Sequence, residues 1–259
     1  MTISGSPVGG AASAFEDIVT RYSKLALSKP KDRPYAIAGL QSRLEKLYNT
    51  ESTHGIVHCC YLKSLLWQRA EIDRMNEIDD AKFKTIPSWS WMKYQGGIRY
   101  GQIPAGNISW NRDIKLAKPD SNNQELHVLE APVVGILHGY SVEPWRYTDY
   151  KIKDSNGRPL GWIRFDDNDK ADIGNLGCVI IAQEKPIGWM ELGSDGWEQF
   201  AYLAGDESLN LSEVSYVLMV SNAAHEQGYK EKVCRRLGVA AIQSVCLSSS
   251  TPPQTVWVI

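Results

Sequence analysis

The sequence predicts an α+β protein that is mostly β, in which a short N-terminal helical segment is followed by an antiparallel β-sandwich or barrel. Three observations predict this class. Apolar residues recur at helical spacing only in the first quarter of the chain. From Ile86 the apolar period changes to two, and turn signals rich in Gly, Pro and Asn become frequent. Many short strands at such spacing are typical of a sandwich or a barrel.

The N-terminal part divides into a tail and a helical segment. Residues 1–14 are small and rich in Gly and Ser, so we expect a disordered tail. The helical segment follows over 15–85. Its helices are expected at 15–27, 36–48 and 56–67, because each stretch carries one apolar stripe and Pro30 ends the first. Residues 70–85 are polar and charged, which is typical of a loop.

The β domain is expected to span 86–259 and to pack on the helices. Its strands are predicted near 97–101, 113–118, 125–142, 147–153, 160–166, 177–183, 186–191, 198–204, 213–221, 232–246 and 254–259. Turn signals such as Asp154-Ser-Asn-Gly157 separate them. A chain of 259 residues can bury a sizeable core without a disulfide or a metal.

Composition and charge exclude several classes of protein. The formal net charge is −2 and no basic stripe offsets it, so we expect no nucleic-acid partner. No apolar run approaches the roughly 20 residues of a membrane-spanning helix, and the first residues lack the features of a secretory signal. The five cysteines are odd in number, two are adjacent and the rest are scattered, which indicates reduced thiols and a cytoplasmic protein.

The motifs of several common chemistries are missing. The chain has no G-x-S-x-G elbow, no P-loop and no G-x-G-x-x-G, so hydrolase, kinase and dinucleotide-binding functions lack support and no cofactor is expected. His54 and His58 would share a helical face and could bind zinc. No second pair of ligands has a matching spacing, so we expect no metal.

Aromatic residues supply the candidate site. Nine Trp and twelve Tyr favour rings with a polar edge, which suit pockets and interfaces, although a β-rich core also uses them. The candidate substrate-pocket residues are Trp67, Trp89, Trp91 and Trp145. Trp89 and Trp91 are two apart, so in a strand both rings share a face. The candidate catalytic residues are Tyr100 and His138, and a buried structural histidine is the alternative for His138.

Several blocks together resemble a known family. Residues 22–67 read YSKLALSKPKDRPYAIAGLQSRLEKLYNTESTHGIVHCCYLKSLLW, and Pro87-Ser-Trp-Ser-Trp91 and Gly97-Ile-Arg-Tyr100 follow. This order resembles the C-terminal region of fungal heterokaryon-incompatibility (HET) domain proteins over roughly 15–259. The family's N-terminal signature, an ALSYxWG-like strand and turn, is missing. The chain is then either a natural stand-alone form of the tail or a shortened protein, and the resemblance does not carry over cell-death signalling.

The resemblance implies two functions of different classes. Short relatives of this family are suspected to be cyclases, so we expect a cofactor-free cyclase or pericyclase, Diels-Alderase-like, acting on a hydrophobic fungal specialised metabolite such as a terpenoid or polyketide. Such chemistry needs only a shaped pocket, where orientation is worth up to ~7–11 kcal/mol, and a few polar donors. The alternative is a non-enzymatic interaction or regulatory module with a protein partner. A closed apolar pocket favours the first, and a large exposed apolar patch favours the second.

Overall fold

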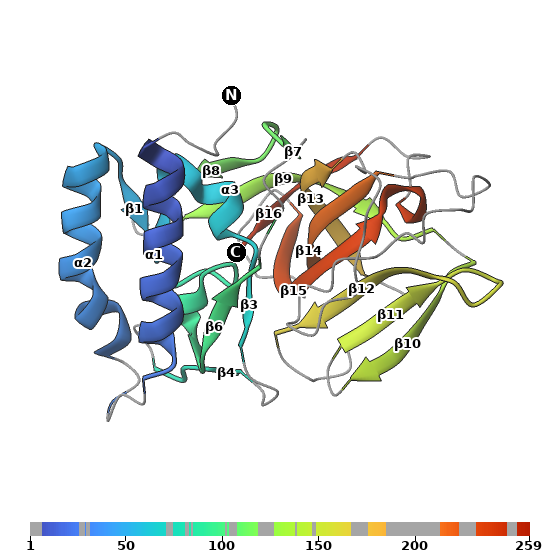
Figure 1. Cartoon of the computed structure of the whole chain (residues 1–259), viewed down its shortest axis with the longest axis horizontal. Helices are drawn as coiled ribbons and strands as arrows, with labels where there is room; N and C mark the ends of the chain where they lie inside the picture. The colour runs from blue at the N-terminus through green and yellow to red at the C-terminus, as the bar shows by residue number, and fades with distance from the viewer. Residues whose placement is uncertain are drawn as a thin grey trace.

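The computed structural model describes residues 7–25, 29, 32–70, 75–80, 83, 85–101, 103, 108–118, 127–137, 139–146, 149–166, 176–184, 213–222, 232–247 and 253–259. Within these residues the protein is mostly β, as predicted, and its helices lie in the N-terminal part. The helices are α1 (Pro7–Ser23), α2 (Arg33–Tyr48) and the single turn α3 (Tyr61–Ser64). They lie together on one side of the molecule, beside the large sheet (Figure 1).

Two expectations for the helical segment are wrong. Helix α1 begins at Pro7, so residues 7–14 are helical rather than disordered. The helix expected at 56–67 is replaced by β2 (Ile56–Val57), a 3₁₀ turn over His58–Cys60, α3 and β3 (Trp67–Arg69). The reason is a tight hairpin between β1 (Ser52–Thr53) and β2.

The hairpin turn itself consists of His54 and Gly55. Both have positive φ, 48° and 79°, which is the backbone of a type I′ connection and is incompatible with a continuing helix. Gly55 is also required for space, because a Cβ there would lie 2.5 Å from the indole nitrogen of Trp91. The β-branched pair Ile56 and Val57 then suits a strand better than a helix.

The described strands after residue 70 are β4 (Asn76–Glu77), β5 (Tyr94–Gln95), β6 (Ile98–Tyr100), β7 (Ile108–Trp110), β8 (Lys115–Ala117), β9 (Val128–Gly135), β10 (Ser141–Arg146), β11 (Asp149–Lys153), β12 (Pro159–Phe165), β13 (Gly177–Glu184), β14 (Val214–Asn222), β15 (Val233–Gln243) and β16 (Gln254–Val258). Most of them overlap a predicted stretch, but β4, β5 and β7 do not, and the single strand predicted at 125–142 is divided between β9 and the start of β10. Strand β4 lies in the stretch expected to be a loop. The strands predicted near 186–191 and 198–204 lie outside the described residues.

The pairing of the strands closes a five-stranded barrel from β9, β13, β14, β15 and β16. All its pairs are antiparallel except β15–β16, which is parallel and joins Val233 to Trp257 and Cys234 to Val258. Further along the same edge of β15, strand β12 pairs with residues 238–242 and leads to β11 and β10. Gly238 begins this second pairing, and a Cβ there would lie 2.2 Å from the carbonyl oxygen of Arg164.

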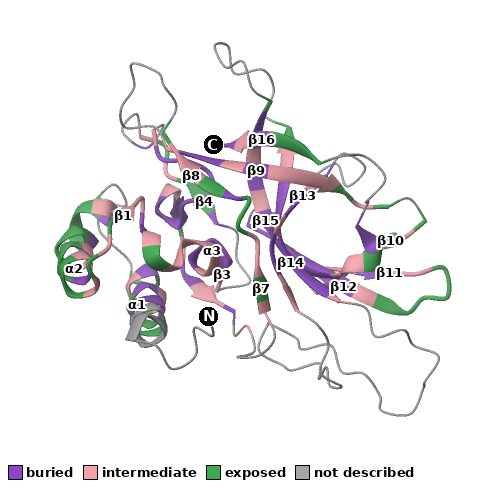
Figure 2. Ribbon diagram, turned by 90° about the horizontal axis from the view of Figure 1, so that it is seen from above, coloured by how far each residue is buried: buried purple, intermediate pink, exposed green. Residues whose placement is uncertain are grey.

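Alternation along the strands gives two apolar clusters. In β14, Leu218 and Val220 belong to the first cluster, whereas Val217 and Met219 belong to the second. The first cluster also contains Phe15 and other residues of the helical segment, so helices and barrel share one core. The second lies against β11 and β12. The buried residues in the strands and on the inner side of α1 are seen in Figure 2.

Candidate functional site

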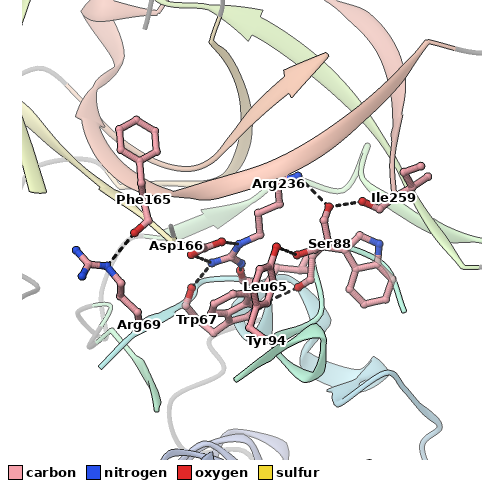
Figure 3. Close-up of polar contacts among 10 residues, drawn as sticks. Leu65, Trp67, Arg69, Ser88, Tyr94, Phe165, Asp166, Arg236 and Ile259 are labelled. Atoms are coloured by element: carbon pink, nitrogen blue, oxygen red, sulfur yellow. Dashed lines mark hydrogen bonds and ion pairs between the residues drawn. The ribbon is translucent and has the colours of Figure 1, made fainter. Parts of the chain in front are cut away.

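A buried arginine connects the helical segment to the barrel. The guanidinium of Arg236, in β15, is 0% exposed and pairs with Asp166 through Nε–Oδ2 at 2.7 Å and Nη2–Oδ1 at 3.1 Å. It also donates to the carbonyl oxygens of Leu65 at 2.7 Å and Trp67 at 2.5 Å, and lies 3.5 Å from the Trp67 ring centroid (Figure 3). The backbone nitrogen of Arg236 donates to Ser88 Oγ at 2.9 Å.

A second set of buried charges continues this network along β3 and β12. Arg164 pairs with both carboxylate oxygens of Asp149 and donates to Gln68 Oε1 at 2.8 Å. Arg69 Nε donates to the carbonyl oxygen of Phe165 at 2.9 Å. Burial lowers the pKa of Arg69, and Asp149 opposes that shift. The charges of this set are paired, although Gln68 Nε2 finds no hydrogen-bond partner among the described residues, so we assign the set a structural role: it holds β3 against the barrel.

A third polar group lies between α1, α3 and β6, and we call it the α1–α3–β6 cluster. It consists of Glu16, Cys60, Lys63, Ser64 and Tyr100. Glu16 Oε2 pairs with Lys63 Nζ at 2.7 Å, and the Cys60 and Ser64 side chains are 3.6 Å apart. Glu16 Oε1 and the Tyr100 hydroxyl are buried and find no hydrogen-bond partner among the described residues.

The local sequence explains why these groups meet. Helix α1 turns Phe15, Glu16 and Val19 inward, and Ser23 at its end accepts a hydrogen bond from the backbone nitrogen of Ile98 at 2.8 Å. This contact sets α1 alongside β6, the strand that carries Tyr100. The short helix α3 then follows the 3₁₀ turn and brings Lys63 to the Glu16 carboxylate.

Burial raises the pKa of three acids of the cluster, Glu16, Cys60 and Tyr100. Burial raises the pKa of Glu16, and the neighbouring Lys63 ammonium opposes the shift. Burial also raises the pKa of Tyr100 well above its ordinary value, and the Glu16 charge adds to this increase. The Cys60 thiol is raised to a pKa of about 12, again mainly by burial. Tyr100 therefore stays protonated, and an unpaired buried hydroxyl is available as a hydrogen-bond donor.

Most of the predicted pocket residues lie in the packed core. Trp67, Trp89 and Trp91 are each 0% exposed, so their rings do not border an open cavity. Trp67 Nε1 donates to the carbonyl oxygen of Trp89 at 2.8 Å, and Trp91 Nε1 donates to that of Gly55 at 3.0 Å. Trp89 and Trp91 are not in a strand, because Trp91 begins a 3₁₀ turn that Ser90 caps. Their bulk instead joins the helices to the barrel.

The remaining predicted residues do not all come together. Tyr100 belongs to the α1–α3–β6 cluster and is the register partner of Trp67. Trp145 is half-buried in β10, on the other side of the molecule from β6 (Figure 1), and Lys151 Nζ lies 4.0 Å from its ring centroid. His138 lies outside the described residues. Among the described residues, the structure thus brings together Tyr100, Trp67 and Trp89, whereas Trp145 lies apart from them.

The histidines of the helical segment make contacts of another kind. His58 Nε2 lies 2.8 Å from Thr53 Oγ1, while the His54 ring stands edge-on to those of Trp89 and His127. Within the described part of the chain, no group of three or more His, Cys, Asp or Glu side chains could hold a metal ion. No helix found there is both long enough and apolar enough to cross a membrane.

Comparisons of the chain with protein-family models, with curated proteins and with solved structures found no match. The interpretation of the site therefore depends on its own geometry. Sequence reasoning missed Glu16 and Lys63, which are 47 positions apart. The signal that could have found Glu16 is its place beside Phe15 and Val19 on the apolar stripe of the first helix, where a carboxylate needs a partner.

Proposed function

We propose that this protein is a cofactor-free cyclase or pericyclase that binds a hydrophobic metabolite at the α1–α3–β6 cluster. The observation that carries the proposal is that two buried polar atoms, Glu16 Oε1 and the Tyr100 hydroxyl, find no hydrogen-bond partner among the residues that the structure describes. Buried polar groups are normally satisfied, so two unsatisfied groups in one cluster are a reason to expect a ligand. The substrate class, a terpenoid or polyketide, comes from the resemblance to short HET-type proteins.

The chemistry expected of the site is hydrogen-bond and acid catalysis. A substrate carbonyl would accept from the Tyr100 hydroxyl, which its raised pKa keeps protonated. Burial raises the pKa of Glu16, so its carboxyl group would donate a second hydrogen bond to the same substrate oxygen or transfer a proton to that oxygen. Polarising the carbonyl of an enone lowers the barrier to cyclisation, and the surrounding apolar core strengthens each such contact. Neither group needs a metal or a redox partner for this role.

The test begins with protein purified from a fungal host. Native mass spectrometry should show a co-purifying apolar small molecule, and stripped protein should change its tryptophan emission when apolar enones are added. Trp67 is the register partner of Tyr100, so the fluorescence emission of Trp67 should change when a ligand binds at the Tyr100 hydroxyl. Tyr100→Phe and Glu16→Gln should each abolish the response and the conversion of any identified substrate.

A neighbouring tyrosine provides the matched control. The Tyr61 hydroxyl donates to the carbonyl oxygen of Ile114 at 2.7 Å, so its hydrogen bond is already satisfied inside the protein. Tyr61→Phe should therefore leave ligand binding and emission unchanged. The proposal fails if Tyr61→Phe and Tyr100→Phe behave alike, or if the purified protein is empty and responds to none of the enones.

A specific observation also favours the second candidate, a non-enzymatic interaction module. Several apolar side chains of the helical segment are exposed: Leu25 is 60%, Tyr35 67% and Leu47 70% exposed. Exposed apolar groups on the helical side suit a protein partner more than a small ligand. The test is the double variant Tyr35→Ser and Leu47→Ser. The interaction module is the better account if this variant no longer co-purifies a protein from the native host that the parent does co-purify, and if the parent binds no small molecule.

A further inference from the structure

Two adjacent cysteines differ from the other three in their surroundings. Cys59 is exposed and Cys60 is half-buried, and both are free thiols. The two residues are consecutive in the chain, so their Cα atoms are about 3.8 Å apart. The remaining cysteines, Cys178, Cys234 and Cys246, are buried in the barrel region. Cys59 and Cys60 thus combine solvent access with a second thiol in reach.

The backbone presents the pair in a defined way. Both residues belong to the 3₁₀ turn His58–Cys60 that links β2 to α3. The Cys59 backbone nitrogen donates to Thr50 Oγ1 at 3.1 Å, and Cys60 Sγ lies 3.6 Å from Ser64 Oγ. Burial raises the pKa of Cys60 to about 12, which keeps it a thiol at neutral pH. The exposed Cys59 is therefore the sulfur that a reagent in solution meets first.

We propose that Cys59 and Cys60 form a redox modification site that hydrogen peroxide converts into a reversible disulfide between the two neighbours. The Cys59 thiolate attacks one peroxide oxygen, so that an S–O bond forms, the O–O bond breaks and the leaving oxygen takes a proton to become water. Cys60 then loses its proton to solvent and attacks the Cys59 sulfur. The S–S bond forms, the S–O bond breaks and the departing hydroxide takes a proton to leave as a second water. Two electrons pass from the two sulfurs to the peroxide.

The spacing of the pair predicts that the bridge is easily reduced. Neighbouring Cα atoms are about 3.8 Å apart, shorter than the roughly 4.4–6.8 Å of ordinary disulfides. A strained bridge of this kind has a more oxidising potential than a structural disulfide, which is the property of a labile, regulatory bond. Its formation also moves Cys60 Sγ relative to Ser64, next to the α1–α3–β6 cluster.

The test uses the full chain, exposed to hydrogen peroxide and then to an alkylating reagent. Intact-mass and peptide analysis should show a product lighter than the reduced protein by two hydrogen atoms, in which Cys59 and Cys60 have lost their reaction with the alkylating reagent. Dithiothreitol should restore both thiols. As a measurement independent of oxidation, phenylarsine oxide should form a one-to-one adduct with the reduced protein, because a single arsenic binds two neighbouring thiols.

Single variants separate the two sulfurs. Cys60→Ser should accumulate a Cys59 sulfenic acid that dimedone traps, and Cys59→Ser should resist the same dose of peroxide. Both should lose the arsenical adduct, whereas Cys234→Ser, which leaves the pair intact, should retain it. Circular dichroism establishes that each variant is folded. The proposal is overturned if the bridge involves Cys178, Cys234 or Cys246, if it joins two molecules, or if Cys59 oxidises past the sulfenic acid in the parent without bridging.

Discussion

Replacing Asp166 by Asn tests whether the buried Arg236–Asp166 pair holds the helical segment on the barrel. The Arg236 side chain is 0% exposed and that of Asp166 is 3% exposed, so water cannot take over the lost contact. Asn offers one acceptor where the carboxylate accepts two bonds, at 2.7 and 3.1 Å, and it leaves the guanidinium charge uncompensated. Breaking such a pair from one side costs about 3–5 kcal/mol of unfolding free energy.

The assay is urea unfolding of the parent and the variant, supported by thermal melting. At about 2–4 °C per kcal/mol for a chain of this size, the expected cost lowers Tm by about 6 to 20 °C. The control is Glu77→Gln, which removes the partner of the adjacent Arg235, an exposed pair whose loss should cost less than about 1 kcal/mol. An Asp166→Asn variant as stable as Glu77→Gln would refute the reasoning, because the pair would then be replaceable by solvent.

Three further predictions concern backbone space, an unpaired hydroxyl and pH. Gly238→Ala should lower the free energy of unfolding in urea by at least about 3 kcal/mol, because the new Cβ would lie 2.2 Å from the carbonyl oxygen of Arg164. As the control, Gly135→Ala should lower it by less than about 1 kcal/mol, because no atom lies within 4 Å of a Cβ there. Tyr100→Phe should leave stability unchanged or raise it by up to about 1 kcal/mol, since its hydroxyl has no described partner; a large loss would reveal one. Burial raises the pKa of Glu16 above 4.5, so the folded protein holds that proton more tightly than the unfolded chain, and stability should fall as pH rises from 4.5 through the raised pKa. Glu16→Gln should flatten this fall, and identical pH profiles would contradict the assignment.

Local pattern was enough to predict most of the longer strands that the structure describes. Strands β9, β11, β12, β13, β14, β15 and β16 each fall within or near a predicted stretch, because alternation of apolar residues is a property of the strand itself. The expectation of a barrel was also confirmed in its coarse form. The pairing of β15 with both β16 and β12 could not be predicted, since it depends on contacts between residues far apart in the chain.

The segment 56–67 shows how tertiary contacts overrode a local pattern. Its apolar residues at 56, 62, 65 and 66 fit a helical stripe, but the His54-Gly55 turn begins a hairpin and Trp91 fills the space beside Gly55. The carbonyl oxygens of Leu65 and Trp67 are taken by Arg236 from β15 instead of by a continuing helix. A buried arginine 169 positions from Trp67 leaves no local signal.

The sequence by itself determined the class of the fold and the helical segment ahead of the strands. Only the tertiary structure decided which groups meet. It placed Trp67, Trp89 and Trp91 in the core, and it brought Glu16 and Lys63 to the cluster that contains Tyr100. The physical reason is that periodicity records which face of an element is buried, whereas the identity of the group on the opposite side depends on how distant segments pack.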